Sequence, residues 1–160
     1  MPTVVPRISD DYNVRIISTE VVLPAPPLQH RIHPLSNLDL TIPPISFCIY
    51  FCYVNPCDRT FESALSHLKT SLSEALATYY VFAGRLVINS VGLPQVVCNN
   101  KGVQFTQAYV AACLSHLNIH NVEKTVQRTL LAPFLKETEE NGLPVFAVQI
   151  LLPTVMKLRI

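Results

Sequence analysis

Hydrophobic and polar positions divide the chain into short apolar runs separated by proline, glycine or polar loops. Val14–Leu23 is rich in β-branched residues and ends at Pro24, a pattern that predicts a β-strand closed by a loop. Ser46–Val54 (SFCIYFCYV) is a nearly continuous apolar run of strand length. Because no polar face remains in this run, we expect a central strand with both faces buried.

A long amphipathic helix is predicted after Asp58. Apolar residues recur there about every 3.6 residues, which predicts a helix of about twenty residues with Asp58 as the N-cap. Gly84 is expected to end this helical region. The predicted apolar stripe consists of Phe61, Leu65, Leu68, Leu72, Ala75, Leu76 and Tyr79.

Apolar runs in the second half of the chain predict further short strands. Arg85–Asn89 and Gln95–Cys98 flank the turn SVGLP and predict a hairpin, and Val103–Tyr109 and Leu143–Leu152 predict two more strands. The order of these elements is typical of an α/β fold, with a mixed β-sheet and flanking helices. Two helical pieces are expected between the last two strands, over Ala111–Leu117 and Val122–Leu131.

Composition narrows the class of protein. The 160 residues fit one domain, which typically takes about 100 to 200 residues. A hydrophobic fraction of 49% with only 14% charged residues predicts a folded core, and leaves few charges to coat the surface. Because so few charges are available, some apolar surface is expected to contact a partner.

A net charge of +1 without a basic cluster argues against nucleic-acid binding.

The N-terminal sequence and the longest uncharged stretch indicate where in the cell the protein is expected and whether it could span a membrane. Prolines and charges interrupt MPTVVPRISDD, so we expect no secretory signal and a cytoplasmic protein. Residues 40–57 carry no charge, but Pro43, Pro44 and Pro56 leave an apolar stretch too short for a membrane span. We therefore interpret this stretch as a buried strand.

Metal-binding and disulfide patterns are weak. His116 and His120 could share one helix face, as zinc ligands do, but no CxxC or HExxH motif accompanies them, so no metal site is expected. His30 and His33 lie in a proline-rich stretch that predicts a solvated loop. The five cysteines lack CxxC spacing and are expected to be small buried hydrophobes: Cys48, Cys52, Cys57, Cys98 and Cys113.

Four segments occur in a recognisable order: LSNLDL (35–40), YYVFAGRL (79–86), VVCNNKGVQFTQA (96–108) and LPVFAVQI (143–150). Together they resemble the N-terminal part of the plant BAHD (HXXXD-type) acyl-CoA-dependent acyltransferases. The resemblance implies a chloramphenicol acetyltransferase-like fold, of which residues 1–160 form an incomplete first domain and residues 151–160 a divergent C-terminal tail. It also implies transfer of an acyl group from a coenzyme A thioester to an alcohol or amine in plant specialised metabolism.

The catalytic signature of that family is missing here. The family uses the histidine of an HxxxD motif as a general base, a role typically worth about 100- to 10,000-fold in rate. No histidine in this sequence is followed four residues later by aspartate, and without tryptophan there is no DFGWG motif. We therefore expect no catalytic residue, no permanently bound cofactor and no turnover by this chain alone, with acyl-CoA and a small-molecule acceptor as the family's substrates.

The resemblance implies two candidate substrate-binding residues. It places the segment CIYF beside the acyl-acceptor channel, with Cys48 and Tyr50 on one side of a strand. Core packing is the alternative that we favour for both side chains. Ser36 and Asp39 are expected to form a turn and cap rather than to take part in chemistry.

Two functions are consistent with these observations. The first is a truncated acyltransferase that keeps the family scaffold without the catalytic base. The second is a non-catalytic, regulatory or interaction fragment that self-associates or docks on a full-length relative, because an incomplete sheet exposes strand edges and a helix face.

Overall fold

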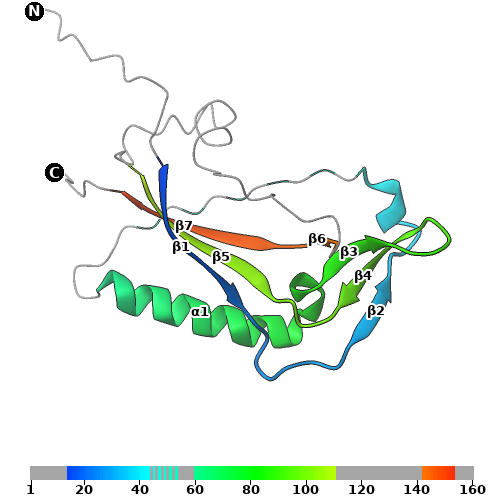
Figure 1. Ribbon diagram of the computed structural model, residues 1–160, viewed down its shortest axis with the longest axis horizontal. Helices are drawn as coiled ribbons and strands as arrows, with labels where there is room; N and C mark the ends of the chain where they lie inside the picture. The colour runs from blue at the N-terminus through cyan, green and yellow to red at the C-terminus, as the bar shows by residue number, and fades with distance from the viewer. Residues whose placement is uncertain are drawn as a thin grey trace, which may run out of the picture. The chain divides into compact units, whose positions relative to one another are not determined.

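The computed structural model describes residues 14–43, 60–110 and 142–153, together with Ile45, Phe47, Ile49, Phe51 and Tyr53 (Figure 1). These residues divide into two compact units, which are described separately. The first unit draws on Met1–Glu20, Gln104–Lys136 and Ala147–Ile160, and the second on Val21–Val103 and Glu137–Phe146.

Three strands form the sheet of the first unit, in the order β1 (Val14–Val22), β5 (Val103–Val110) and β7 (Ala147–Pro153). Figure 1 shows them side by side. β5 and β7 run parallel over their whole shared length, and most side chains of β5 are buried, Phe105 and Ala108 almost completely. Residues on both faces of this strand are buried, as is typical of a strand inside a sheet that is covered on both sides.

The second unit contains a four-stranded sheet in the order β2 (Arg31–Pro34), β4 (Pro94–Cys98), β3 (Arg85–Ile88) and β6 (Leu143–Pro144). Each neighbouring pair in this sheet is antiparallel. Together with the parallel β5–β7 pair and one long helix, these strands give an α/β architecture. The predicted fold class is therefore confirmed.

The hairpin between β3 and β4 forms where the sequence predicts it. Its turn is closed by a hydrogen bond of 2.8 Å from Asn89 N to Leu93 O. The Asn89 side chain also accepts hydrogen bonds from Val91 N and Leu93 N, as asparagine commonly does in turns. Gly92 adopts a φ of +81° in this turn.

Helix α1 extends over Phe61–Thr78 and begins at Thr60, whose hydroxyl accepts a hydrogen bond of 3.3 Å from Ser63 N. Thr60 is thus the N-cap. The prediction of Asp58 as the cap is wrong, because the cap position directly before Phe61 is occupied by Thr60. A 3-10 turn, η2 (Tyr80–Ala83), follows α1 and ends at Gly84. The helical region therefore ends where the sequence predicts.

The prediction of a buried central strand over Ser46–Val54 is wrong for the residues of that range that the structure describes. Phe47, Ile49, Phe51 and Tyr53 belong to no strand and are 68–82% exposed. Their apolar character indicated burial, but none of the described strands pairs with them. They consequently have neither ladder hydrogen bonds nor a facing layer of side chains.

Two other predictions needed changes. The final apolar run is split between β6 and β7, which belong to different sheets, because Val145 and Phe146 interrupt the pairing. Phe146 instead packs against Phe82, with ring centroids 5.6 Å apart. His33 lies in the exposed strand β2 rather than in a loop. The helical pieces predicted within residues 111–131 lie outside the described residues.

Candidate functional site

The segment LSNLDL forms a self-contained turn. The Asp39 carboxylate accepts hydrogen bonds from the hydroxyl (2.7 Å) and the backbone N–H (2.8 Å) of Ser36. These bonds hold the pKa of Asp39 below its usual range, with a smaller contribution from His33. Asp39 then opens the 3-10 turn η1 (Asp39–Thr41). The predicted structural role of Ser36 and Asp39 is confirmed.

The segment YYVFAGRL joins helix to sheet through a close backbone contact. A Cβ on Gly84 would lie only 2.6 Å from Val96 Cγ1 and 2.9 Å from Val97 O. Arg85 donates hydrogen bonds of 2.9 Å to the carbonyl oxygens of Gly84 and Gly102. The arginine thereby ties this segment to the loop that precedes β5.

The segment VVCNNKG anchors the chain that follows β1. The side chain of Asn100 bonds to both backbone groups of Leu28: it accepts from Leu28 N at 3.1 Å and donates to Leu28 O. Gly102, with a φ of +73°, lies so close to Val22 O that a Cβ would approach it to 2.5 Å. These contacts fix the path of residues 22–28 against the β4–β5 connection.

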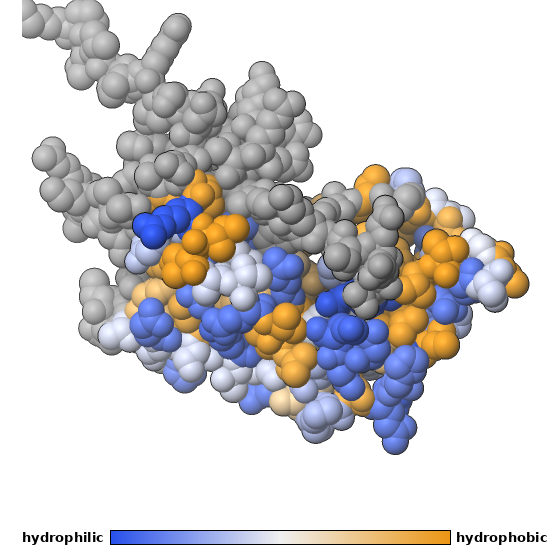
Figure 2. All heavy atoms as spheres, in the orientation of Figure 1, coloured by the Kyte–Doolittle hydropathy of each residue, from blue (hydrophilic) through white to orange (hydrophobic). Residues whose placement is uncertain are grey.

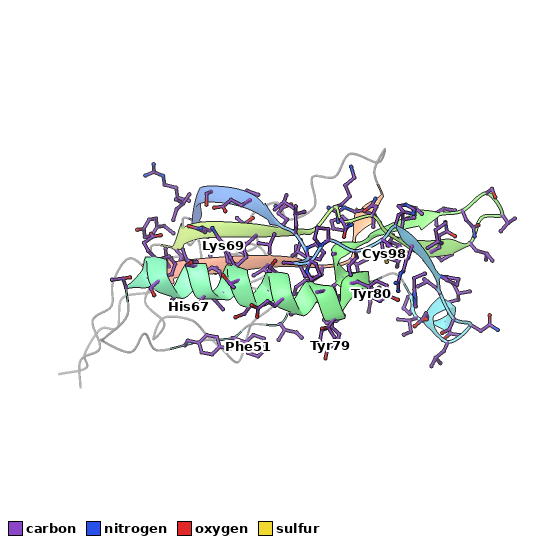
Figure 3. The ribbon with its side chains drawn as sticks, turned by 90° about the horizontal axis from the view of Figure 1, so that it is seen from below. Phe51, His67, Lys69, Tyr79, Tyr80 and Cys98 are labelled. Carbon is purple, nitrogen blue, oxygen red and sulfur yellow. The ribbon has the colours of Figure 1, made fainter. Side chains whose placement is uncertain are left out.

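Cys98 lies at the end of β4, where Figure 3 labels it with Tyr80. Burial raises the pKa of its thiol, and the opposing effect of Arg31 is smaller. The Arg31 guanidinium lies over the Tyr80 ring, 5.6 Å from its centroid. A buried thiol with a raised pKa is a poor nucleophile, so Cys98 is a small core hydrophobe, as predicted.

A polar row crosses the sheet of the first unit, and the sequence reasoning missed it. The buried hydroxyl of Thr106 lies 3.4 Å from that of Thr19 and accepts a hydrogen bond of the same length from Gln104. Gln149 occupies the paired position on β7. The signal was available, since Gln104 and Thr106 alternate with apolar residues on β5. These groups are neutral hydrogen-bonding partners and provide no general base.

The nominated substrate-binding residues, Cys48 and Tyr50, lie outside the described residues. Of their neighbours, Phe51 and Tyr53 stack with ring centroids 6.3 Å apart. Among the described histidines, His30, His33 and His67 are all exposed. The part of the chain that the structure describes holds no group of three potential metal ligands and no helix long and apolar enough to cross a membrane.

Comparison with known proteins supplies the family. The model of the family described as "Transferase family" matches residues 12–152, which is most of the chain. The chain belongs to this family, the plant BAHD acyltransferases. The resemblance carried by the four ordered segments is therefore confirmed. In this BAHD chain, YYVFAGRL and VVCNNKGVQFTQA form the junctions described above, and LSNLDL forms a local turn.

The relatives are acyltransferases of plant specialised metabolism. Vinorine synthase from Rauvolfia serpentina is 35% identical over 117 residues, covering 69% of this chain and 27% of the relative. Limonoid 21-O-acetyltransferase from Melia azedarach is 34% identical over 125 residues, covering 76% and 28%. The BAHD chain thus spans little more than a quarter of the length of these curated relatives.

A solved structure supports the same conclusion. The crystal structure of vinorine synthase matches with a TM-score of 0.56 and 26% identity, covering 89% of this chain and 35% of that chain. The described sheets and helix therefore follow the BAHD fold, and they represent its N-terminal portion.

Proposed function

We propose that this chain is the N-terminal portion of an enzyme that transfers an acyl group from a coenzyme A thioester to an alcohol or amine of a plant metabolite. Acyl-CoA and a small acceptor are its substrates within a complete catalytic fold, and it works in the cytoplasm without a permanently bound cofactor. The observation that carries this proposal is the family match over residues 12–152.

By itself, the 160-residue chain is proposed to be inactive. Removing the proton of an acceptor hydroxyl requires a base within hydrogen-bond reach of it. No histidine begins an HxxxD motif, and the described histidines are exposed. Two well-placed polar side chains, Arg85 and Asn100, form hydrogen bonds with backbone groups. These bonds stabilise the scaffold.

Cys48 and Tyr50 remain our proposed substrate-binding residues, in a complete fold that residues 1–160 begin as one partial domain. Support comes from the described neighbours of these two residues. Ile49 and Phe51 are exposed apolar side chains, suited to contact an apolar acceptor or another layer of the protein.

An assay of the purified chain tests the proposal of inactivity. The chain is incubated with acetyl-CoA or caffeoyl-CoA and a panel of alcohols and amines, and esters or amides are quantified by mass spectrometry. We expect no product above the protein-free background. The fatty alcohol:caffeoyl-CoA acyltransferase of Arabidopsis thaliana, with a fatty alcohol in the panel, is the positive control for the assay. Sustained turnover by the chain would contradict the proposal. Because the sequence has no HxxxD motif, such turnover would require some other residue to act as the base.

A second candidate function is a non-catalytic interaction fragment. It is favoured by the exposure of Phe47, Ile49, Phe51 and Tyr53, since large apolar groups gathered on a surface commonly mark an interaction site. A full-length relative and a second copy of the chain are the two kinds of partner that this function allows.

A further inference from the structure

The turn closed by Ser36 and Asp39 is exposed and local. Ser36 lies in the short connection between β2 and η1 and belongs to no helix or strand (Figure 1). Its hydroxyl donates to Asp39 Oδ2 at 2.7 Å and accepts from Asp39 N at 3.2 Å, and both residues are exposed. Because these bonds join neighbouring residues at the surface, the turn can open without breaking a strand pairing.

The spacing to an acidic residue distinguishes Ser36 from similar hydroxyl groups. Among the described residues, the exposed hydroxyls outside helices and strands are those of Ser36, Thr60 and Ser90. Ser36 is followed three positions later by the carboxylate of Asp39. The corresponding residues after Thr60 and Ser90 are Ser63 and Leu93, which carry no charge. Of these three hydroxyls, only that of Ser36 offers a nearby carboxylate to a basic recognition pocket.

Ser71 repeats the spacing in a different backbone conformation. Glu74 follows it by three residues and both are exposed, but both lie within α1. The active site of a protein kinase binds its target residue in an extended segment, and α1 would have to unfold to supply one. Ser71 therefore has the acidic neighbour without the accessible backbone.

The strand that precedes Ser36 is solvated and carries basic groups. All four residues of β2 are exposed, among them Arg31 and His33. Figure 2 shows hydrophilic side chains at the surface over this strand. His33 lies near enough to Asp39 to contribute to the lowered pKa of that carboxyl. A phosphate at Ser36 thus has basic groups in the same stretch of chain.

We propose that Ser36 is a phosphorylation site for a serine kinase that recognises the Asp39 carboxylate, and that the added phosphate opens the Ser36–Asp39 turn. In the transfer, Ser36 Oγ forms a bond to the γ-phosphorus of ATP, the bond from that phosphorus to the β–γ bridging oxygen breaks, and ADP leaves. The hydroxyl proton passes to the catalytic aspartate of the kinase. The proposal does not depend on acyl transfer.

The phosphate reverses the interaction that closes the turn. The esterified Oγ has no proton to donate to Asp39, and the phosphate adds a charge of about −1.5 to −2 beside the carboxylate. Loss of a donor and gain of a like charge both favour the neutral form of Asp39, so its pKa should rise. The amide of Leu40, which donates to Ser36 O at 3.1 Å, should exchange faster with solvent once the turn opens.

Phosphorylation of the folded chain tests the recognition step. The full 160-residue chain is incubated with Mg²⁺, ATP and casein kinase II, a kinase that selects a carboxylate three residues after its target, and modified residues are located by mass spectrometry. We expect phosphate on Ser36, and we expect Asp39→Asn to slow its addition at least about tenfold by removing the recognised charge. Glu74→Gln, the matched control on α1, should leave the rate at Ser36 unchanged. Ser71 should stay unmodified.

A second measurement tests the opening of the turn. An NMR titration of the phosphorylated chain should give a higher Asp39 pKa than the unmodified chain, and circular dichroism verifies that each variant keeps the wild-type fold. Absence of phosphate on Ser36, equal rates for Asp39→Asn and the wild type, or an unchanged Asp39 pKa after phosphorylation would overturn the proposal. Equal modification of Ser71 in the folded chain would also overturn it, because the exposed connection would then not select the site.

Discussion

Gly92 and Gly102 share a backbone conformation but differ in their surroundings. Their φ angles are +81° and +73°, yet a Cβ on Gly92 would meet nothing within 4 Å, whereas one on Gly102 would lie 2.5 Å from Val22 O. Alanine at either position adopts an unfavourable φ, at a cost of about 1–2 kcal/mol. Only at Gly102 does the side chain also collide with backbone that cannot rotate away.

We therefore expect Gly102→Ala to lower the free energy of unfolding more than Gly92→Ala does. The additional loss should be about 1–3 kcal/mol, the usual cost of overpacking. Urea denaturation of the two variants, followed by circular dichroism, measures the difference. Equal losses would show that the approach to Val22 O relaxes without cost.

The carboxyl group of Asp39 gives a pH-dependent prediction. Hydrogen bonds from Ser36 lower its pKa in the folded state, so its contribution to stability is present above the unfolded-state pKa and disappears as pH falls through the folded-state value. We expect Asp39→Asn to be less stable than the wild type near neutral pH, with the difference vanishing in acid. In an NMR titration, Ser36→Ala should raise the Asp39 pKa part of the way toward its usual range, because the backbone N–H of residue 36 still donates. An unchanged pKa would exclude the Ser36 hydroxyl as a cause.

At the level of elements, the start of α1 depends on one hydroxyl. Thr60 accepts a hydrogen bond from Ser63 N and so satisfies a backbone donor that the helix leaves unpaired. We expect Thr60→Ala to lower the free energy of unfolding by about 1 kcal/mol and Thr60→Ser to retain most of it. Thermal unfolding followed by circular dichroism compares them. Identical melting curves for the alanine and wild-type proteins would mean that another group caps the helix.

Elements governed by local sequence were predictable. The helix and the β3–β4 hairpin are encoded by periodicity and by turn residues such as Asn89, all within short stretches of chain. The segment around Phe51 was not predictable in the same way, because an apolar run indicates burial only where a partner layer exists. The split between β6 and β7 also depends on distant strands that supply the pairing.

In the candidate site, the roles of residues in local turns were predictable, whereas contacts between distant strands were not. The roles of Ser36 and Asp39 followed from local turn chemistry, and the buried state of Cys98 from its apolar neighbours. The alternation of Gln104 and Thr106 with apolar residues is visible in the sequence of β5. Their contacts with Thr19 and the pairing of Thr106 with Gln149 depend on strands that are far apart in sequence, so the sequence alone did not reveal them. Cys48 and Tyr50 stay predictions.

At the level of the whole molecule, the contacts that the structure describes concern the scaffold. The chain carries the BAHD fold over residues 12–152 but spans about a third of a solved relative. The ordered contacts of Gly84, Arg85 and Asn100 hold helix, sheet and loops in place. In our account, the reacting groups come from the portion of the fold that this chain does not contain.

A fusion protein tests that account most directly. The chain is joined to the part of limonoid 21-O-acetyltransferase from Melia azedarach that it does not match, and acetyl ester formed from acetyl-CoA and a limonoid alcohol is measured by mass spectrometry. We predict product from the folded fusion, at least about 100-fold above a fusion in which the HxxxD histidine is replaced by alanine. A folded fusion without activity, or one that loses nothing with that histidine, would contradict the account.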